Sequence, residues 1–135
     1  MADTFQLSVL TPLREVFSGE VETVTVSGHD GDFGVLPGHV AYITSVDPGA
    51  LVIEGKDGKQ VLAIGDGFAQ VAATKVSVIV SSATDAADLD EGQVNDDLGK
   101  AAEALLQLGP SDPEHEDARF DQAMALGKLR AIAVR

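Results

Sequence analysis

The spacing of apolar residues changes once along this chain of 135 residues, between Ala83 and Asp88. Before that point apolar side chains alternate with polar ones, and this period of two, rich in valine and threonine, predicts β-strands. The clearest alternating positions are Phe5, Leu7, Val9, Val24, Val26, Val76, Val78 and Val80. After that point apolar residues recur every three or four positions, which predicts amphipathic helices. We therefore expect an α+β chain in which an antiparallel β-sandwich or barrel precedes the helices.

Turn residues separate the expected strands. Asp57-Gly58 lies between apolar runs at 51–54 and 60–64, and it predicts a β-hairpin because both positions can take positive φ. Asp47-Pro48-Gly49 predicts another turn, in which proline fixes φ before a glycine. These signals indicate many short strands.

The second half of the chain predicts an αα-hairpin. Its first helix is expected to end at Gly109-Pro110. Asp112 is expected to cap the second helix, with Pro113 at the first helical position. The first apolar face holds Val94, Leu98, Ala101 or Ala102, Leu105 and Leu108. The second holds Phe120, Met124, Gly127, Ala131 and Val134, widened by Leu126, Leu129 and Ile132.

Glycines inside both expected helices make the hairpin weak by itself. Gly92, Gly99 and Gly127 each cost about 1 kcal/mol relative to alanine. We infer that the hairpin depends on packing against the sandwich for much of its order. Two interpretations stay open, namely a helical cap permanently packed on the sandwich and an arm that changes partners.

Charge and composition exclude several classes of function. The formal net charge is −13, so nucleic acid and anionic lipid, which select clustered lysine and arginine, are not expected partners. The absence of cysteine excludes disulfides and thiolate zinc sites. The first residues do not form a signal peptide, and no apolar run reaches the ~20 residues needed to cross a bilayer. We expect a soluble, cytoplasmic protein without direct membrane insertion.

The stretch DGDFGVLPGH, residues 30–39, is the first candidate for a functional segment. Its glycines match neither of the phosphate-binding patterns GxGxxG and GxxxxGK(S/T). The histidines, His29, His39 and His115, lack the spacing of a metal site, and no GxSxG motif supports a serine hydrolase. We therefore expect no catalytic residue, no metal and no cofactor. The stretch is interpreted as a turn, or as a turn that contacts a partner.

Several segments, taken in order, carry a resemblance to one family. They are VFSGEVE at 16–22, GDFGVLPGH at 31–39, DPGALVI at 47–53, IGDGFAQVAATKVSVI at 64–79, ATDAADLDEGQV at 83–94 and LGKLRAIA at 126–133. The whole chain resembles the epsilon subunit of bacterial F-type ATP synthases, which is similar to the mitochondrial delta subunit. The resemblance implies an antiparallel β-sandwich of about ten strands in residues 1–84. It also implies a two-helix antiparallel hairpin in residues 88–135.

The resemblance implies a part of the rotor, in the central stalk, that performs no chemistry itself. The sandwich would bind the gamma subunit on one side and the polar loops of the membrane c-ring on the other. The hairpin would be regulatory: folded down it packs on the sandwich, and extended it reaches the catalytic α/β hexamer and inhibits ATP hydrolysis. Such a subunit is expected at the cytoplasmic face of the bacterial inner membrane, as a peripheral part of the complex.

Individual site residues follow from the same resemblance. Asp32 and His39 match positions that face the c-ring loops, and the alternative for His39 is a side chain that merely completes a turn. Four hairpin cations are available to meet acidic surface on the hexamer: Arg119, Lys128, Arg130 and Arg135. The alternative for these is a helix end that matches its dipole. Residues 85–121 contain twelve acidic residues and two basic ones, so strong electrostatic docking to acidic segments is not expected.

The ATP-binding motif of the family is only partly present in this chain. Some members bind ATP at the start of the first helix through the motif (I/L)DxxRA. Here Asp90 is retained, but Gln93 replaces the arginine and Val94 replaces the alanine. Glutamine has no charge to neutralise a triphosphate, so we predict weak or absent ATP binding.

Two other classes of protein fit parts of the sequence. One is a stand-alone β-sandwich ligand-binding protein with a helical lid, and the other is a small hydrolase that uses His39 with an acid. The order of the matching segments over the full length favours the rotor subunit over both.

Overall fold

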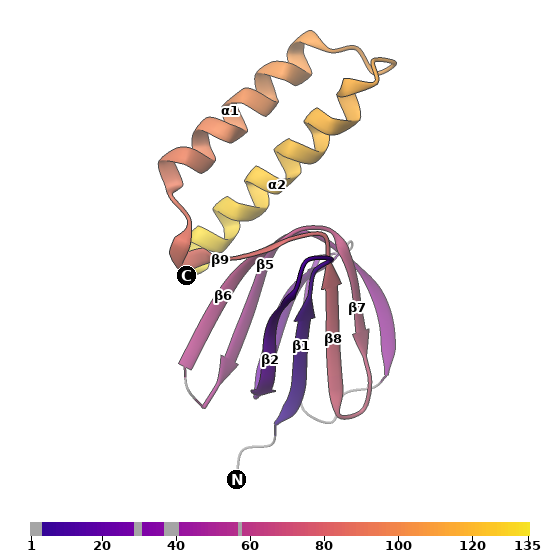
Figure 1. The fold of residues 1–135 in the computed structure, drawn as a ribbon, viewed down its shortest axis with the longest axis vertical. Helices are drawn as coiled ribbons and strands as arrows, with labels where there is room; N and C mark the ends of the chain where they lie inside the picture. The colour runs from indigo at the N-terminus through magenta and orange to yellow at the C-terminus, as the bar shows by residue number, and fades with distance from the viewer. Residues whose placement is uncertain (1–3, 29–30, 37–40, 57) are drawn as a thin grey trace.

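The computed structural model describes residues 4–28, 31–36, 41–56 and 58–135, and its strands precede its helices (Figure 1). The strands are β1 (Phe5–Leu10), β2 (Glu15–Val21), β3 (Thr23–Gly28), β4 (Gly31–Val35), β5 (Tyr42–Gly55), β6 (Gly58–Ile64), β7 (Gly67–Val71), β8 (Lys75–Val80) and β9 (Ala83–Asp85). A short 3-10 helix, η1 (Ala86–Asp88), leads to α1 (Glu91–Gln107) and α2 (Glu114–Val134). The expected α+β chain is confirmed, with nine strands among the described residues where about ten were expected.

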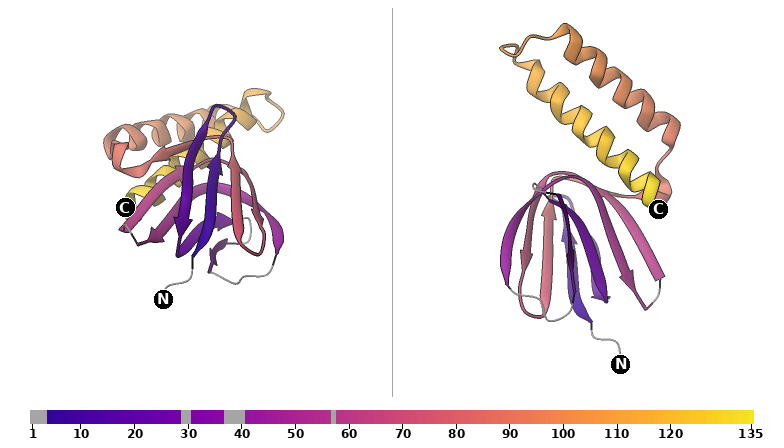
Figure 2. Two further views of the ribbon diagram at one scale, coloured as in Figure 1. Left: turned by 60° about the horizontal axis from the view of Figure 1, so that its bottom comes forward. Right: turned by 180° about the vertical axis from the view of Figure 1, so that it is seen from behind.

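The strands form two layers that share β5 (Figures 1 and 2). One layer has the order β2-β1-β8-β7-β5, and the other has the order β4-β3-β5-β6-β9. The first part of β5 pairs with β7 up to Val46, and its last part pairs with β6 from Gly49 onward. The sandwich is not antiparallel throughout, because β1 and β8 run parallel.

The turn predicted at Asp47-Pro48-Gly49 is wrong. β5 continues through this segment as one strand of 14 residues, which changes its partner here from β7 to β6. Pro48 has no N–H to donate, but it lies between the two ladders, where no donor is needed. One long strand therefore stands where two short ones were predicted, which lowers the strand count.

The hairpin predicted at Asp57-Gly58 is confirmed. β5 and β6 pair as far as Gly55 and Gly58, and Gly58 has a φ of +113°. Asp57 itself lies outside the described residues. The alternation of apolar residues is also confirmed, since every strand position that it predicted for the core is buried. The core that results is almost entirely aliphatic.

The stretch interpreted as a turn contains a strand, because its residues 31–35 form β4 and pair with β3. Gly31 begins β4 with a φ of +118°, a conformation that favours glycine. Val35 is buried, and the ring of Phe33 packs edge-to-face on that of Tyr42 with centroids 6.1 Å apart. Leu36 is 61% exposed, so it does not anchor the segment in the core.

The helical hairpin is confirmed, and it leans on one end of the sandwich. The carboxylate of Asp90 caps α1 by accepting a hydrogen bond from the N–H of Gly92 at 2.9 Å. At the start of α2, Pro113 has helical φ and ψ, and the Asp112 carboxylate accepts from the N–H of Glu114 at 3.4 Å. Figures 1 and 2 show the C-terminal half of α2 against the sandwich, with the α1–α2 loop held away from it.

The apolar face predicted for α2 is partly wrong. Its buried residues are all small: Ala118, Ala125, Gly127 and Ala131. Phe120, Leu126 and Val134 were predicted on the buried face, but they are 44%, 50% and 40% exposed. Close approach of two backbones selects short side chains, so size decides which residues of α2 are buried and hydrophobicity alone does not.

Candidate partner-binding sites

α2 meets β5 through two glycines. A Cβ atom added to Gly127 would lie 2.6 Å from the amide nitrogen of Gly49 and 2.9 Å from its Cα atom, which is too close for any side chain. A Cβ atom added to Gly49 would in turn overlap the hydroxyl of Ser27. The backbones of helix and strand therefore touch. Gly127, which weakens the isolated helix, serves as a contact point between the two parts of the protein.

Ser27 supports this contact from within the sandwich. The β3–β5 ladder shifts its register between Val26 and Gly28, so the backbone pairing is interrupted at this residue. The buried Ser27 hydroxyl accepts a hydrogen bond from the N–H of Ala50 at 3.0 Å and donates one to its carbonyl oxygen at 3.1 Å. The side chain thus replaces the backbone pairing that is lost at the bulge.

Small apolar residues complete the contact between hairpin and sandwich, which we call the docking seam. The seam consists of Gly49, Ala50, Val52, Val61, Ala63, Ala86, Leu89, Gly127 and Ala131. The guanidinium of Arg135 donates hydrogen bonds to the carbonyl oxygens of Ala86 at 2.6 Å and Leu89 at 2.9 Å, beside this seam. Arg135, predicted as a hexamer contact, therefore holds the linker to α1 in this conformation.

Two residues predicted to bind different partners lie together at the edge of the docking seam. Nη1 of Arg130 is 3.6 Å from Oδ1 of Asp32, and both side chains are more than half exposed. Arg130 also lines a cavity of about 680 Å³ between α2 and β5, together with Gly31 and Asp47. In this conformation the Asp32 carboxylate is thus engaged by the hairpin. His39, predicted to act with Asp32, lies outside the described residues.

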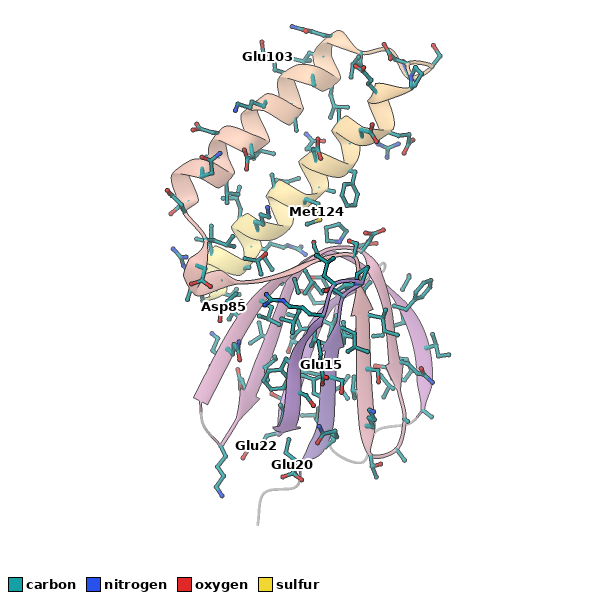
Figure 3. All side chains as sticks on the ribbon, in the orientation of Figure 1. Glu15, Glu20, Glu22, Asp85, Glu103 and Met124 are labelled. Carbon is teal, nitrogen blue, oxygen red and sulfur yellow. The ribbon has the colours of Figure 1, made fainter. Side chains whose placement is uncertain are left out.

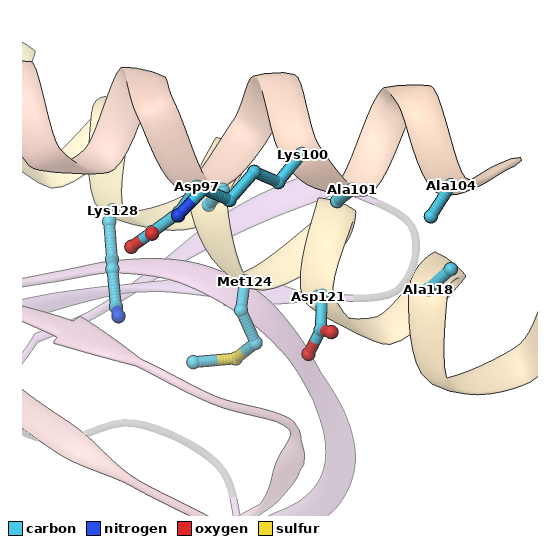
Figure 4. Close-up of a pocket in the computed structure, with 9 residues that line it drawn as sticks. Asp97, Lys100, Ala101, Ala104, Ala118, Asp121, Met124 and Lys128 are labelled. Carbon is cyan, nitrogen blue, oxygen red and sulfur yellow. The ribbon is translucent and has the colours of Figure 1, made fainter. Parts of the chain in front are cut away.

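The other two basic candidates have different neighbours. Arg119 forms an exposed pair with Glu116, one turn earlier on α2, at 3.8 Å. Lys128 lines a cleft of about 320 Å³ between the two helices, beside Asp97 and Lys100 of α1 (Figure 4). The four candidate cations therefore do not form one basic patch while the hairpin is folded down.

Asp90, the retained residue of the nucleotide motif, has a structural task as the cap of α1. Gln93, which replaces the arginine of that motif, donates a hydrogen bond from its side chain to Oδ1 of Asp97 at 3.0 Å. Neither Asp90 nor Gln93 is among the described residues that line the cleft between the helices. The arrangement thus gives this motif a role in helix stability.

The sandwich also carries an apolar surface that the sequence did not predict. Phe68 pairs with Ile79 and Ile79 with Leu10 across β7, β8 and β1, and Ile43 on β5 pairs with Gln70, two residues along β7 from Phe68. Ile43, Phe68 and Ile79 are 69%, 61% and 48% exposed. We call these four residues the outer apolar row. One signal in the sequence was Ile79, which breaks the alternation of apolar and polar residues in β8.

Other features of the described residues add little chemistry to these surfaces. No group of three or more His, Asp or Glu side chains that could hold a metal ion occurs among them. Burial raises the pKa of Tyr42 above its ordinary value. In the described part of the chain, no helix has the length and apolar character needed to span a membrane. The geometry therefore points to an exposed contact surface, the outer apolar row, and to an internal contact between hairpin and sandwich, the docking seam.

A sandwich with a docked helical hairpin and an exposed apolar row has the features of a partner-binding subunit. Residues 4–86 match the family model described as ATP synthase, Delta/Epsilon chain, beta-sandwich domain. The chain is 36% identical to an ATP synthase epsilon chain of Geotalea uraniireducens (strain Rf4), in an alignment that covers 100% of this chain and 99% of that protein. The chain belongs to the ATP synthase delta/epsilon family, and it is a non-catalytic, rotor-stalk subunit of an ATP synthase.

Two solved structures share the fold. A chain in the cryo-EM structure of the Euglena gracilis mitochondrial ATP synthase, OSCP/F1/c-ring in rotational state 1, matches with a TM-score of 0.82 and 23% identity, covering 98% of this chain and 82% of that one. A chain in the cryo-EM structure of the Tetrahymena thermophila mitochondrial ATP synthase, central stalk/c-ring, matches with a TM-score of 0.61 and 14% identity, covering 96% and 97%. Both likenesses extend over sandwich and hairpin.

Proposed function

We propose that this chain connects the gamma subunit to the c-ring in the central stalk of an ATP synthase, and that its hairpin regulates ATP hydrolysis. Residues 1–84 would form the binding domain, and residues 88–135 would form the regulatory domain. The full-length match to an ATP synthase epsilon chain supports this proposal. The same match argues against a stand-alone ligand-binding protein with a helical lid and against a hydrolase that uses His39.

The outer apolar row is the observation that carries the gamma-binding part of the proposal. Single exposed apolar residues are ordinary on protein surfaces, but Ile43, Phe68 and Ile79 lie on three neighbouring strands. A cluster of exposed apolar residues marks an interaction surface, and aromatic residues such as Phe68 are enriched in the cores of protein interfaces. We assign this surface to gamma, because the family resemblance places gamma on one side of the sandwich.

The remaining contacts are proposed from the resemblance and from charge. Asp32 and His39 are assigned to the c-ring loops. Arg119, Lys128, Arg130 and Arg135 are assigned to the α/β hexamer when the hairpin is extended. Arg130 and Arg135 have partners inside the folded chain, and extension would free both. The complex would lie at the cytoplasmic face of the bacterial inner membrane, and Asp90 would not support strong ATP binding.

Replacement of Phe68 by serine tests the gamma-binding surface. Loss of a central aromatic anchor costs about 2 kcal/mol or more in an interface, so the affinity for gamma from the same organism should fall about 30-fold or more. Titration of gamma with the full-length chain measures this affinity. Leu106→Ser is the matched control, because Leu106 is 88% exposed on α1, away from the row. Equal affinities of the two variants for gamma would reject the proposed surface.

A further inference from the structure

We propose that Asp32 is shared between the hairpin and the c-ring, so that folding the hairpin down weakens the contact of the sandwich with the c-ring. This inference rests on the proposed function, which places Asp32 at the c-ring. In the folded chain its carboxylate lies 3.6 Å from the guanidinium of Arg130. A carboxylate that is paired with one cation binds a second cation less strongly, so the two contacts compete.

Contact of α2 with β5 at the docking seam brings Arg130 and Asp32 together. Gly127 sets α2 directly on the backbone of β5, and Arg130 lies three residues later, on the same face of the helix. Nη1 of Arg130 comes within 3.8 Å of the position that a Cβ atom of Gly49 would occupy. Its guanidinium therefore lies over β5, within reach of the Asp32 side chain from β4. The pair can form only while α2 is docked, so it reports the position of the hairpin at the edge of the sandwich.

The surroundings of the pair favour a basic group on the partner. Asp47 and Arg130 line the same cavity, and the Arg130 guanidinium lies beside the Asp32 carboxylate. When α2 leaves, Arg130 leaves with it, and the Asp32 carboxylate remains on the sandwich. The surface then attracts a guanidinium or ammonium group. A partner loop with an acidic side chain would instead bind more tightly while the hairpin is docked, because Arg130 would attract it and Asp32 would repel it.

The exposure of the pair sets the size of the effect. The Arg130 and Asp32 side chains are 63% and 56% exposed, so water and salt screen their attraction. Exposed pairs of this kind change an equilibrium constant about two- to fivefold. The competition is therefore modest, and a chain with its hairpin down still binds the c-ring. By linkage, c-ring binding disfavours docking of the hairpin by the same factor.

The test uses the full chain and two probes from the same organism, purified gamma and a purified gamma–c-ring subcomplex, at low ionic strength. The chain has no cysteine, so cysteines introduced at Lys75 and Glu103 accept spin labels specifically. Lys75 is exposed at the start of β8, and Figure 3 shows Glu103 on the outer side of α1. The distance between the two labels reports whether the hairpin is docked, and titrations give the two affinities.

Arg130→Gln should lower the docked fraction and raise the affinity for gamma–c-ring about two- to fivefold. Asp32→Asn should also lower the docked fraction, but it should weaken binding to gamma–c-ring. Adding Arg130→Gln to Asp32→Asn should then change nothing further. All variants should bind gamma alone equally well. Lys100→Gln is the control, because it removes the same charge from α1, on the cleft between the helices.

The outcomes distinguish the competition for Asp32, the charge of the partner group and the proposed rotor function. If Arg130→Gln binds gamma–c-ring as Lys100→Gln does, the competition is refuted while the rotor role stands. If Arg130→Gln weakens binding, the partner presents an acidic group and the proposed chemistry is wrong. If the unmodified chain binds neither gamma nor gamma–c-ring, the proposed function itself fails.

Discussion

Replacement of Gly127 by alanine perturbs the docking seam at its closest contact. The new Cβ atom would lie 2.6 Å from the Gly49 nitrogen, so α2 must move away from β5 or both backbones must strain. Overpacking of this kind costs about 1–3 kcal/mol, and the cost falls on the docked state alone. The change also favours the helix by about 1 kcal/mol, but it does so in docked and undocked hairpins alike. We expect the docking equilibrium constant to fall about five- to 150-fold.

Hydrogen exchange of the full chain measures this change, because docking protects peptides from β5 and from the end of α2. Gly99→Ala is the matched control. It makes the same replacement within α1, but nothing lies within 4 Å of its new Cβ atom. Exchange at the docking seam should rise in Gly127→Ala and stay unchanged in Gly99→Ala. Equal exchange at the seam in both variants would refute the reasoning that the backbone contact controls docking.

Three further predictions concern stability and regulation. Ser27→Ala removes both hydrogen bonds to Ala50 and should lower the free energy of unfolding in urea by about 1–3 kcal/mol; an unchanged midpoint would contradict the role of Ser27 at the bulge. Asp90→Ala removes the cap of α1 and should lower the free energy of unfolding by about 1 kcal/mol, with a loss of helical circular dichroism. Asp96→Ala, at an exposed position within α1, should change neither quantity. Removal of residues 88–135 from the assembled synthase should raise ATP hydrolysis and leave synthesis largely intact; an unchanged hydrolysis rate would exclude an inhibitory hairpin.

The strands could be predicted because the alternation of apolar and polar residues within each strand already shows which side chains are buried. Val76, Val78 and Val80 alternate with their neighbours whatever sheet they join, so the period of two identifies them before any partner is known. The same reasoning fails at Pro48, where a residue typical of turns lies inside a strand. A proline fixes its own φ and lacks an N–H donor, but it does not reveal that β5 changes its pairing partner there.

The candidate sites were less predictable, because they depend on contacts between distant parts of the chain. No local pattern indicates that Gly127 faces Gly49 or that Arg130 reaches Asp32. The outer apolar row shows the same limit, since Phe68 and Ile79 come together only when β7 and β8 pair. Periodicity assigns a residue to one face of its own element, and the fold decides what that face meets.

The small side chains of the docking seam also decide how its opening depends on temperature. Alanine, valine and glycine make up most of this contact, so separation of α2 from the sandwich uncovers little apolar surface. The heat-capacity change of unfolding or opening scales with the apolar area that becomes hydrated. Opening of this seam therefore carries a small heat-capacity change, and its equilibrium varies gently with temperature. A chain with an open seam also adds little adhesive surface, which favours its persistence as a monomer.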